Sequence, residues 1–143
     1  PQKRMLFNPA ESIDLQGNTG PFIQYSHARI KSVLRKATER GISWSATMPE
    51  SAAPLHAAEK ELVKLLGQYP AMVEEARAKL SPAVVCAYAY ELATAFNKFY
   101  HDCSMLNETK EAVRQFRLAL AAQTADYLRK TLDLVGIEAP ERM

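Results

Sequence analysis

Hydrophobic residues recur every three to four positions along most of the chain, which is the spacing that places them on one face of an α-helix. Capping and turn residues divide this pattern into five predicted helices, at about residues 19–40, 55–67, 70–80, 82–102 and 108–135. Only five glycines are present and helix-favouring residues are plentiful, so a β-sandwich with many tight turns is not expected. The predicted fold is all-α, a single bundle of about five helices.

The residues at the ends of the predicted helices support these boundaries. N-caps are expected at Thr19, Ser81 and Asn107, and a proline lies in the first turn after Thr19 and after Ser81. Gly41 and Gly136 are expected just past the ends of the first and last helices, where glycine is favoured.

The predicted core is formed by one apolar stripe on each helix. In the first helix the stripe comprises Ile23, Ile30, Val33, Leu34 and Ala37. Leu80 and Leu134, at the ends of the third and fifth helices, are also expected to face inward. The last helix is apolar over more than half of its circumference, which indicates that other helices surround it.

The first eighteen residues lack a helical pattern. Asn8-Pro9 and Gly17-Asn18 are turn signals, and Ile13 and Leu15 alternate with polar residues. We expect an extended arm at residues 1–18 that packs on another part of the protein, followed by a helical domain at residues 19–143. Trp44, in the loop after the first helix, is expected to pack against the bundle because a Trp buries a large apolar area.

Positive charge is concentrated at the front of the chain. The net charge of the 143 residues is only +2, but residues 1–40 hold seven basic and three acidic residues. Such a field permits an anionic partner. No uncharged stretch reaches the roughly 20 apolar residues that span a bilayer, and no apolar signal region follows the N-terminus. We therefore expect a cytoplasmic protein without a membrane partner.

The sequence has none of the common catalytic motifs. It contains no Gly-rich phosphate loop, no Cys-x-x-Cys, no His-Glu-x-x-His and no Gly-x-Ser-x-Gly. His27, His56 and His101 fall in different predicted elements, so they do not form a metal site by their spacing. No catalytic residue, metal ligand or cofactor is predicted in this chain.

The first helix carries the most informative polar pattern. One flank, beside the core stripe, presents aromatic and basic side chains at helical spacing: Phe22, Tyr25, Arg29, Lys36 and Arg40. Rings stack on unpaired bases and cations follow phosphates, so this flank fits single-stranded nucleic acid. The alternative is that Phe22 belongs to the core, Tyr25 packs on a loop and the cations are solvated. Tyr100 poses the same question at the edge of the fourth helix.

Several stretches resemble arginyl-tRNA synthetases. The block Gly17-Asn18-Thr19-Gly20-Pro21-Phe22-Ile23-Gln24-Tyr25, with the residues from Met5 before it, resembles the junction between the catalytic and anticodon-binding domains of that family. Residues 90–93 and 96–101 resemble a later part of the same domain, and residues 136–143, which end in Glu141-Arg142-Met143, resemble the family's C-terminus. The chain departs from the family's DALR signature, which here reads Gln115-Phe116-Arg117-Leu118.

The resemblance implies a DALR-type helical anticodon-binding domain. Together with the flank of the first helix, it predicts RNA binding by eight residues: Phe22, Gln24, Tyr25, Arg29, Lys36, Tyr100, Arg142 and Met143. The expected ligand is the anticodon stem-loop of arginine tRNA.

The HIGH and KMSKS motifs, which bind ATP in class I synthetases, are absent from the sequence. We therefore interpret the chain as the C-terminal part of a longer enzyme that attaches arginine to tRNA using ATP with magnesium. This part is expected to be non-catalytic and monomeric, with arginine tRNA and the upstream catalytic domain as partners. The alternative is a helical protein-interaction module that docks through residues 1–18 and the Phe22/Tyr25 flank without binding RNA.

Overall fold

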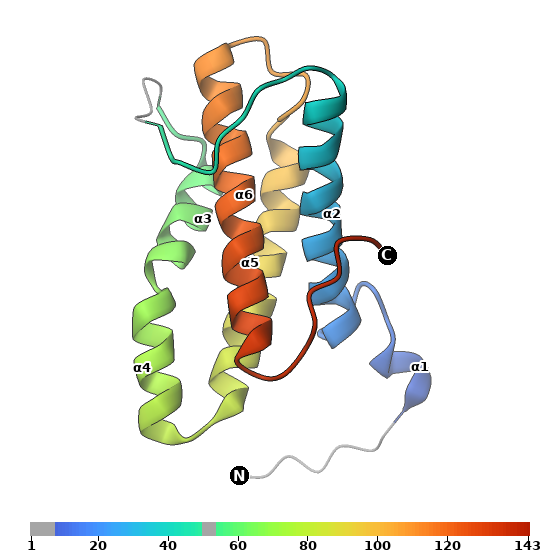
Figure 1. The fold of residues 1–143 in the computed structure, drawn as a ribbon. Coiled ribbons are helices and arrows are strands. Elements are labelled where there is room, and N and C mark those ends of the chain that lie inside the picture. The colour runs from blue at the N-terminus through green and yellow to red at the C-terminus, as the bar shows by residue number, and fades with distance from the viewer. Residues whose placement is uncertain (1–7, 50–53) are drawn as a thin grey trace.

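A computed structural model describes residues 8–49 and 54–143 of the chain. The described residues form six helices and no strands: α1 Pro9–Ser12, α2 Gly20–Glu39, α3 Ala57–Gly67, α4 Tyr69–Lys79, α5 Pro82–Asp102 and α6 Glu111–Asp133 (Figure 1). Five of them are long, so the prediction of an all-α bundle of about five helices is confirmed. None of these helices is both long enough and apolar enough to cross a membrane.

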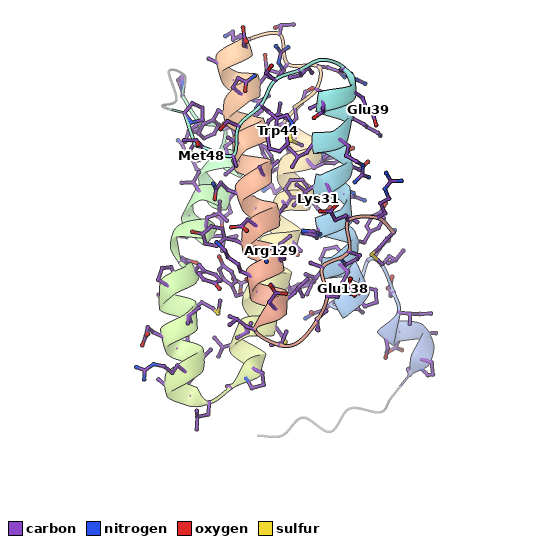
Figure 2. The ribbon with its side chains drawn as sticks, in the orientation of Figure 1. Lys31, Glu39, Trp44, Met48, Arg129 and Glu138 are labelled. Atoms are coloured by element: carbon purple, nitrogen blue, oxygen red, sulfur yellow. The ribbon has the colours of Figure 1, made fainter. Side chains whose placement is uncertain are left out.

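Helices α5 and α6 form the middle of the bundle. Helix α5 contacts α2, α3, α4 and α6, while α6 also contacts α2 and α3. The largest fully buried side chains lie on these contacts and include Ile30, Leu62, Leu92, Phe96, Leu120 and Leu128. Side chains fill the spaces between the ribbons (Figure 2). The prediction that the last helix is surrounded by others is therefore confirmed.

Helix α2 begins and ends as its sequence predicts. The hydroxyl oxygen of Thr19 accepts a hydrogen bond from the Phe22 amide at 3.2 Å, and a proline occupies the first turn. Gly41 follows the helix at a φ of +70°, in the region that glycine reaches most easily. The predicted apolar stripe of this helix is buried throughout.

Other helix ends differ from the prediction. Helix α6 begins at Glu111 rather than after Asn107, because the Glu108 carboxylate binds the Lys110 amide and holds these residues in a turn. Ser81 makes no capping hydrogen bond through its side chain, although α5 does begin at Pro82. Helix α3 has a capping box that was not predicted from the sequence. The Glu59 carboxylate accepts a hydrogen bond from the His56 amide at 2.7 Å, and the His56 ring accepts one from the Ala58 amide at 3.2 Å.

Two leucines predicted to face inward are exposed. Leu80 ends α4 with a φ of +46° and is 89% exposed. Leu134 follows the last residue of α6 and is 52% exposed. Both predictions were wrong because helical spacing was extended by one residue past the end of each helix, where the direction of the chain changes.

The described part of the arm is not extended throughout. Asn8 caps one turn of helix by accepting a hydrogen bond from the Ala10 amide at 3.1 Å. Ile13 and Leu15 are 69% and 45% exposed, and the packing of the arm on another part of the protein stays a prediction. The start of the resembling segment, at Met5–Phe7, lies outside the described residues.

The loop after α2 packs on the bundle as predicted for Trp44. The indole Nε1 of Trp44 donates to the Thr38 hydroxyl at 3.2 Å, and the ring packs against the core. Gln123 of α6 also donates to the Ala46 carbonyl oxygen at 2.6 Å. This loop is therefore held to both α2 and α6.

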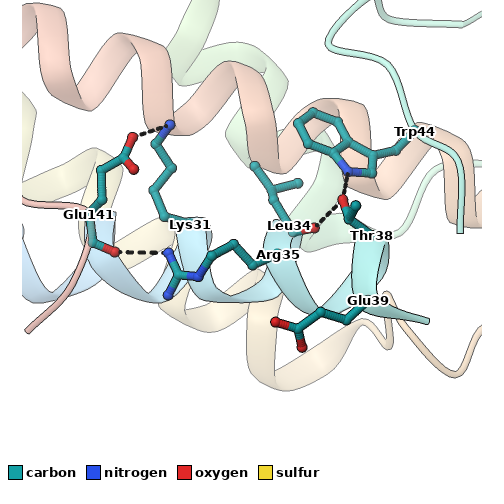
Figure 3. A pocket seen from close by; sticks show the side chains of 7 residues that line it. All are labelled: Lys31, Leu34, Arg35, Thr38, Glu39, Trp44 and Glu141. Atoms are coloured by element: carbon teal, nitrogen blue, oxygen red, sulfur yellow. Dashed lines mark hydrogen bonds and ion pairs between the residues drawn. The ribbon is translucent and has the colours of Figure 1, made fainter. Parts of the chain in front are cut away.

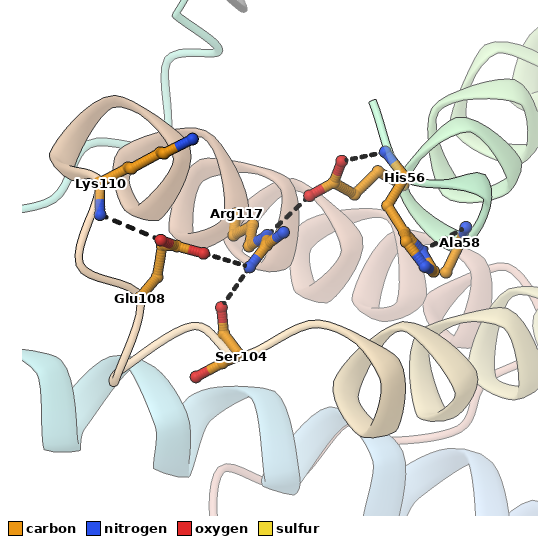
Figure 4. Close-up of polar contacts among 7 residues, drawn as sticks. His56, Ala58, Ser104, Glu108, Lys110 and Arg117 are labelled. Atoms are coloured by element: carbon orange, nitrogen blue, oxygen red, sulfur yellow. Dashed lines mark hydrogen bonds and ion pairs between the residues drawn. The ribbon is translucent and has the colours of Figure 1, made fainter. Parts of the chain in front are cut away.

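A buried ionic cluster joins α3, α6 and the α5–α6 connection (Figure 4). The Arg117 guanidinium contacts Glu59 at 2.7 Å and Glu108 at 2.9 Å, and it donates to the Ser104 carbonyl oxygen at 2.7 Å. The Arg117 side chain is only 14% exposed. Arg117 belongs to the altered DALR signature, and its contacts give it a structural role in this chain.

Candidate nucleic-acid interface

Residues from α2, α5 and the C-terminal tail line one open groove of about 680 Å³. We call it the Tyr25 groove and define it by Tyr25, Arg29, Asn97, Tyr100, Arg142 and Met143. The tail, residues 137–143, returns from the end of α6 along α2 and brings the last two residues to the groove (Figure 1). Five of the eight predicted RNA-binding residues thus come together from distant parts of the sequence.

Arg29 lies between two aromatic rings. Its Cζ is 4.8 Å from the centre of the Tyr25 ring and 5.4 Å from the centre of the Tyr100 ring. These distances are within the range of cation–π contacts. The partners of Arg29 here are neutral, so its positive charge is not cancelled.

Asn97 fixes the orientation of Arg29. Its side-chain oxygen accepts a hydrogen bond from Arg29 Nη1. Its side-chain nitrogen donates to the Ser26 hydroxyl at 2.8 Å and to the Ala93 carbonyl oxygen at 2.9 Å. Asn97 was not among the predicted site residues. It lies three residues before Tyr100 on α5, so helical spacing from Tyr100 was the signal that could have found it.

Neighbouring side chains cover part of Tyr100 and leave part of it accessible. Its ring packs against Phe96, with ring centres 6.2 Å apart, and Phe96 is fully buried. Tyr100 itself is 44% exposed. Packing on the core holds the ring in place, so its exposed part is preformed for contact with a flat ligand.

Three predicted site residues lie outside the groove lining. Phe22 packs against the core and against Tyr90, with ring centres 5.5 Å apart. The Gln24 side chain donates to the Glu138 carbonyl oxygen at 2.8 Å, so it contacts the tail. Lys36 is exposed on α2 beyond the lining residues.

The charge of the groove is positive. Arg29, Arg35 and Arg142 line it, and among the described residues no Asp or Glu side chain does. His101 also lines the groove, and its hydrogen bond holds the pKa of the neighbouring Asp102 below the usual range. The described residues contain no group of three or more His, Cys, Asp or Glu side chains placed to hold a metal ion. The arrangement suits flat, anionic ligands.

A family model and curated relatives match this chain. The DALR anticodon binding domain model matches residues 23–143. An arginine–tRNA ligase of Parabacteroides distasonis is 48% identical over 143 residues, which cover 100% of this chain and 24% of the relative. That of Phocaeicola vulgatus is 47% identical over 142 residues, which cover 99% of this chain and 23% of the relative. The chain thus spans less than a quarter of the length of these relatives.

A solved structure agrees with this match. The arginyl-tRNA synthetase of Thermus thermophilus superposes with a TM-score of 0.79 at 32% identity, over 96% of this chain and 23% of that one. The resemblance in the sequence, the family model and the fold therefore coincide over nearly the whole chain. The chain belongs to the DALR anticodon-binding domain family.

Proposed function

We propose that this chain is the tRNA anticodon-binding domain of an arginine–tRNA ligase and that the Tyr25 groove binds the anticodon stem-loop of arginine tRNA. The observation that carries the proposal is the arrangement of Arg29 between Tyr25 and Tyr100 in a groove lined by arginines and no carboxylate side chains among the described residues. Family membership and the arginine–tRNA ligase relatives support the choice of ligand.

The chemistry of an anticodon loop matches this groove. Its unpaired bases expose flat faces that stack on aromatic rings or on an arginine plane, and its backbone is anionic. Tyr100 and Tyr25 offer the rings, and Arg29 and Arg142 offer charges that bind phosphate or stack on a base. Met143 adds an apolar contact at the rim, where it is 61% exposed.

The remaining predicted residues act from outside the groove in this proposal. Phe22 supports the start of α2 by packing on Tyr90, one turn before Tyr25. Lys36 contributes to the field that attracts the RNA backbone, because exposed cations act on phosphates within about 10 Å at ordinary salt. Gln24 contributes indirectly, because its side chain holds the C-terminal tail through the Glu138 carbonyl oxygen.

The ligase reaction itself belongs to an upstream catalytic domain of the same protein, which uses ATP with magnesium in the cytoplasm. Binding energy gained at the anticodon orients the acceptor end of the tRNA for that reaction, which is how contacts far from the reacting atoms raise turnover. The anticodon-binding part acts as a monomer in this proposal.

The test is binding of arginine tRNA and of a non-cognate tRNA by the 143-residue chain at two salt concentrations. We expect tighter binding of arginine tRNA and a loss of affinity at the higher salt. Arg77→Ala is a suitable control, because Arg77 is exposed on α4 and pairs only with Glu74 among the described residues. Equal affinity for both tRNAs contradicts the choice of arginine tRNA as the ligand. No binding of either tRNA contradicts RNA binding altogether and favours the protein-interaction module.

A further inference from the structure

We infer that four side chains of α2 hold the end of the C-terminal tail in the Tyr25 groove and so position Arg142 and Met143 for RNA. The four are Gln24, His27, Lys31 and Arg35, which we call the tail-binding stripe. They are positioning residues that act through the tail. The consequence for RNA rests on the proposed function, whereas the effect on the tail does not.

The stripe contacts the tail at Glu138, Pro140 and Glu141. Gln24 donates to the Glu138 carbonyl oxygen at 2.8 Å, and His27 Nδ1 donates to the Pro140 carbonyl oxygen at 2.8 Å. One turn further along, Lys31 pairs with the Glu141 carboxylate at 3.0 Å. Figure 2 shows Lys31 and Glu138 on the side of α2 along which the tail runs.

Arg35 connects the stripe to the groove. Its Nη1 donates to the Glu141 carbonyl oxygen at 3.1 Å, as Figure 3 shows beside the Lys31–Glu141 pair. Arg35 also lines the Tyr25 groove, together with the two residues that follow Glu141. The last contact of the stripe therefore lies directly before Arg142 and Met143.

Spacing explains why one helix can make all four contacts. Steps of three, four and four residues keep the four side chains on one face of α2. Three of the four contacts are to backbone carbonyl oxygens, so they fix the path of the tail rather than reading its side chains. A fixed path determines where the next residues lie.

His27 is the buried centre of the stripe. It is 1% exposed, and burial lowers its pKa. The hydrogen bond to Pro140 and the Glu141 charge oppose this shift of the pKa, while the charges of Lys31 and Arg129 add to it. Its donation to Pro140 places a proton on Nδ1, so the neutral ring makes the contact without burying a charge.

The core holds the first half of the tail but not the second. Ile137 and Ala139 pack against the core, whereas the last three residues are exposed. Loss of the stripe contacts is therefore expected to free residues 140–143 without unfolding the bundle. This separates a positioning role from a general role in stability.

The experiment uses Gln24→Leu, His27→Leu and His27→Asn in the 143-residue chain, with the Met143 methyl group labelled for nuclear magnetic resonance. Asparagine keeps a donor at the position of Nδ1, so His27→Asn tests rescue. Gln24 is only half-buried, which makes Gln24→Leu safe for folding. The matched control is Gln123→Leu, which removes the same kind of bond, from a glutamine to the Ala46 carbonyl oxygen.

We expect Gln24→Leu and His27→Leu to raise the mobility of the Met143 methyl group and to weaken binding of the arginine anticodon stem-loop by about two- to tenfold each. His27→Asn and Gln123→Leu are expected to stay close to wild type in both measurements. An equally ordered methyl group in Gln24→Leu and His27→Leu overturns the inference, as does a mobile methyl group with unchanged RNA affinity. A wild-type chain that binds no RNA contradicts the proposed function instead, and the methyl measurement then decides the tail contacts alone.

Discussion

Two arginines of this domain, Arg29 and Arg117, differ in the charge of the groups that they contact. The partners of Arg117 include carboxylates, whereas those of Arg29 are neutral. Arg117 is 14% exposed and binds two carboxylates and a backbone carbonyl oxygen. Arg29 is half-buried between two tyrosine rings and binds only a neutral amide oxygen. An arginine whose charge is neutralised on all sides holds the fold together. One that is oriented by neutral groups keeps its charge for a ligand.

The largest expected effect is the loss of stability when Arg117 is replaced. Arg117→Met leaves the Glu59 and Glu108 carboxylates without their shared partner, and Glu59 is 4% exposed in its side chain. We expect the free energy of unfolding to fall by about 3 kcal/mol, because a buried charge loses its partner. Chemical denaturation measures this change.

The control for that variant is Arg129→Met. Arg129 also pairs with two carboxylates, Asp126 and Asp133, but it is 50% exposed. Exposed ion pairs contribute little to stability because water and salt screen them, so this variant is expected to stay near wild type. An equal loss of stability in Arg117→Met and Arg129→Met would contradict the claim that burial makes the Arg117 ion pairs more important for the fold.

On the binding side, Tyr25→Ala has the largest expected effect. Removal of one stacked ring costs about 1–3 kcal/mol, or about five- to a hundredfold in the affinity for arginine tRNA. Stability is expected to change little, because Tyr25 is only half-buried and its ring contacts Arg29 at the groove. Affinity and thermal midpoint are measured on the same sample.

Phe22→Ala is the matched aromatic variant, one turn away on the same helix. Phe22 contacts Tyr90 and the core rather than the groove, so we expect about 2 kcal/mol of lost stability and a smaller loss of affinity. If Tyr25→Ala unfolds the domain while Phe22→Ala does not, the assignment of the two rings is reversed.

Arg29→Ala is expected to reduce the salt dependence of tRNA binding by about one phosphate contact. Arg29→Lys restores the charge but not the planar group between the rings, so the salt dependence returns while part of the affinity does not. Binding measured from low to high salt gives both quantities. An unchanged slope in Arg29→Ala means that this cation does not contact phosphate.

The smallest expected effect is a pH dependence of stability that arises at His27. Burial lowers the pKa of His27, so around its ordinary value of about 6.5 the unfolded chain binds more protons than the folded one. The free energy of unfolding is therefore expected to fall as the pH falls from 7.5 to 5.5. His27→Asn is expected to flatten this slope, and denaturation at the two pH values measures it.

Most of the fold could be predicted from the sequence because its signals are local. The Thr19 cap, Gly41 and the apolar stripe of α2 follow from neighbouring residues, and the structure has all of them. The wrong predictions for Asn107 and Leu80 both lie at helix ends. There the periodic pattern continues in the sequence, but the helix begins later or ends earlier than the pattern indicates.

The groove could be predicted only in part, for a related reason. Helical spacing placed Tyr25 and Arg29 on one flank, and the resemblance added Tyr100 and Met143. The contacts that bring these residues together join positions about a hundred residues apart, such as Gln24 to Glu138 and His27 to Pro140. The polar stripe on α2 is visible in the sequence, but its partner is not.

The central claim is that the Tyr25 groove binds the anticodon stem-loop. Its most direct test is a titration of the isotope-labelled 143-residue chain with the stem-loop of arginine tRNA, in which nuclear magnetic resonance measures the chemical-shift change of each residue. We predict that the largest chemical-shift changes fall on the residues of the Tyr25 groove, Tyr25, Arg29, Asn97, Tyr100, Arg142 and Met143. We also predict that Arg117 and its partners shift little. Shifts centred on α3 and α4, with the groove unchanged, would contradict the claim.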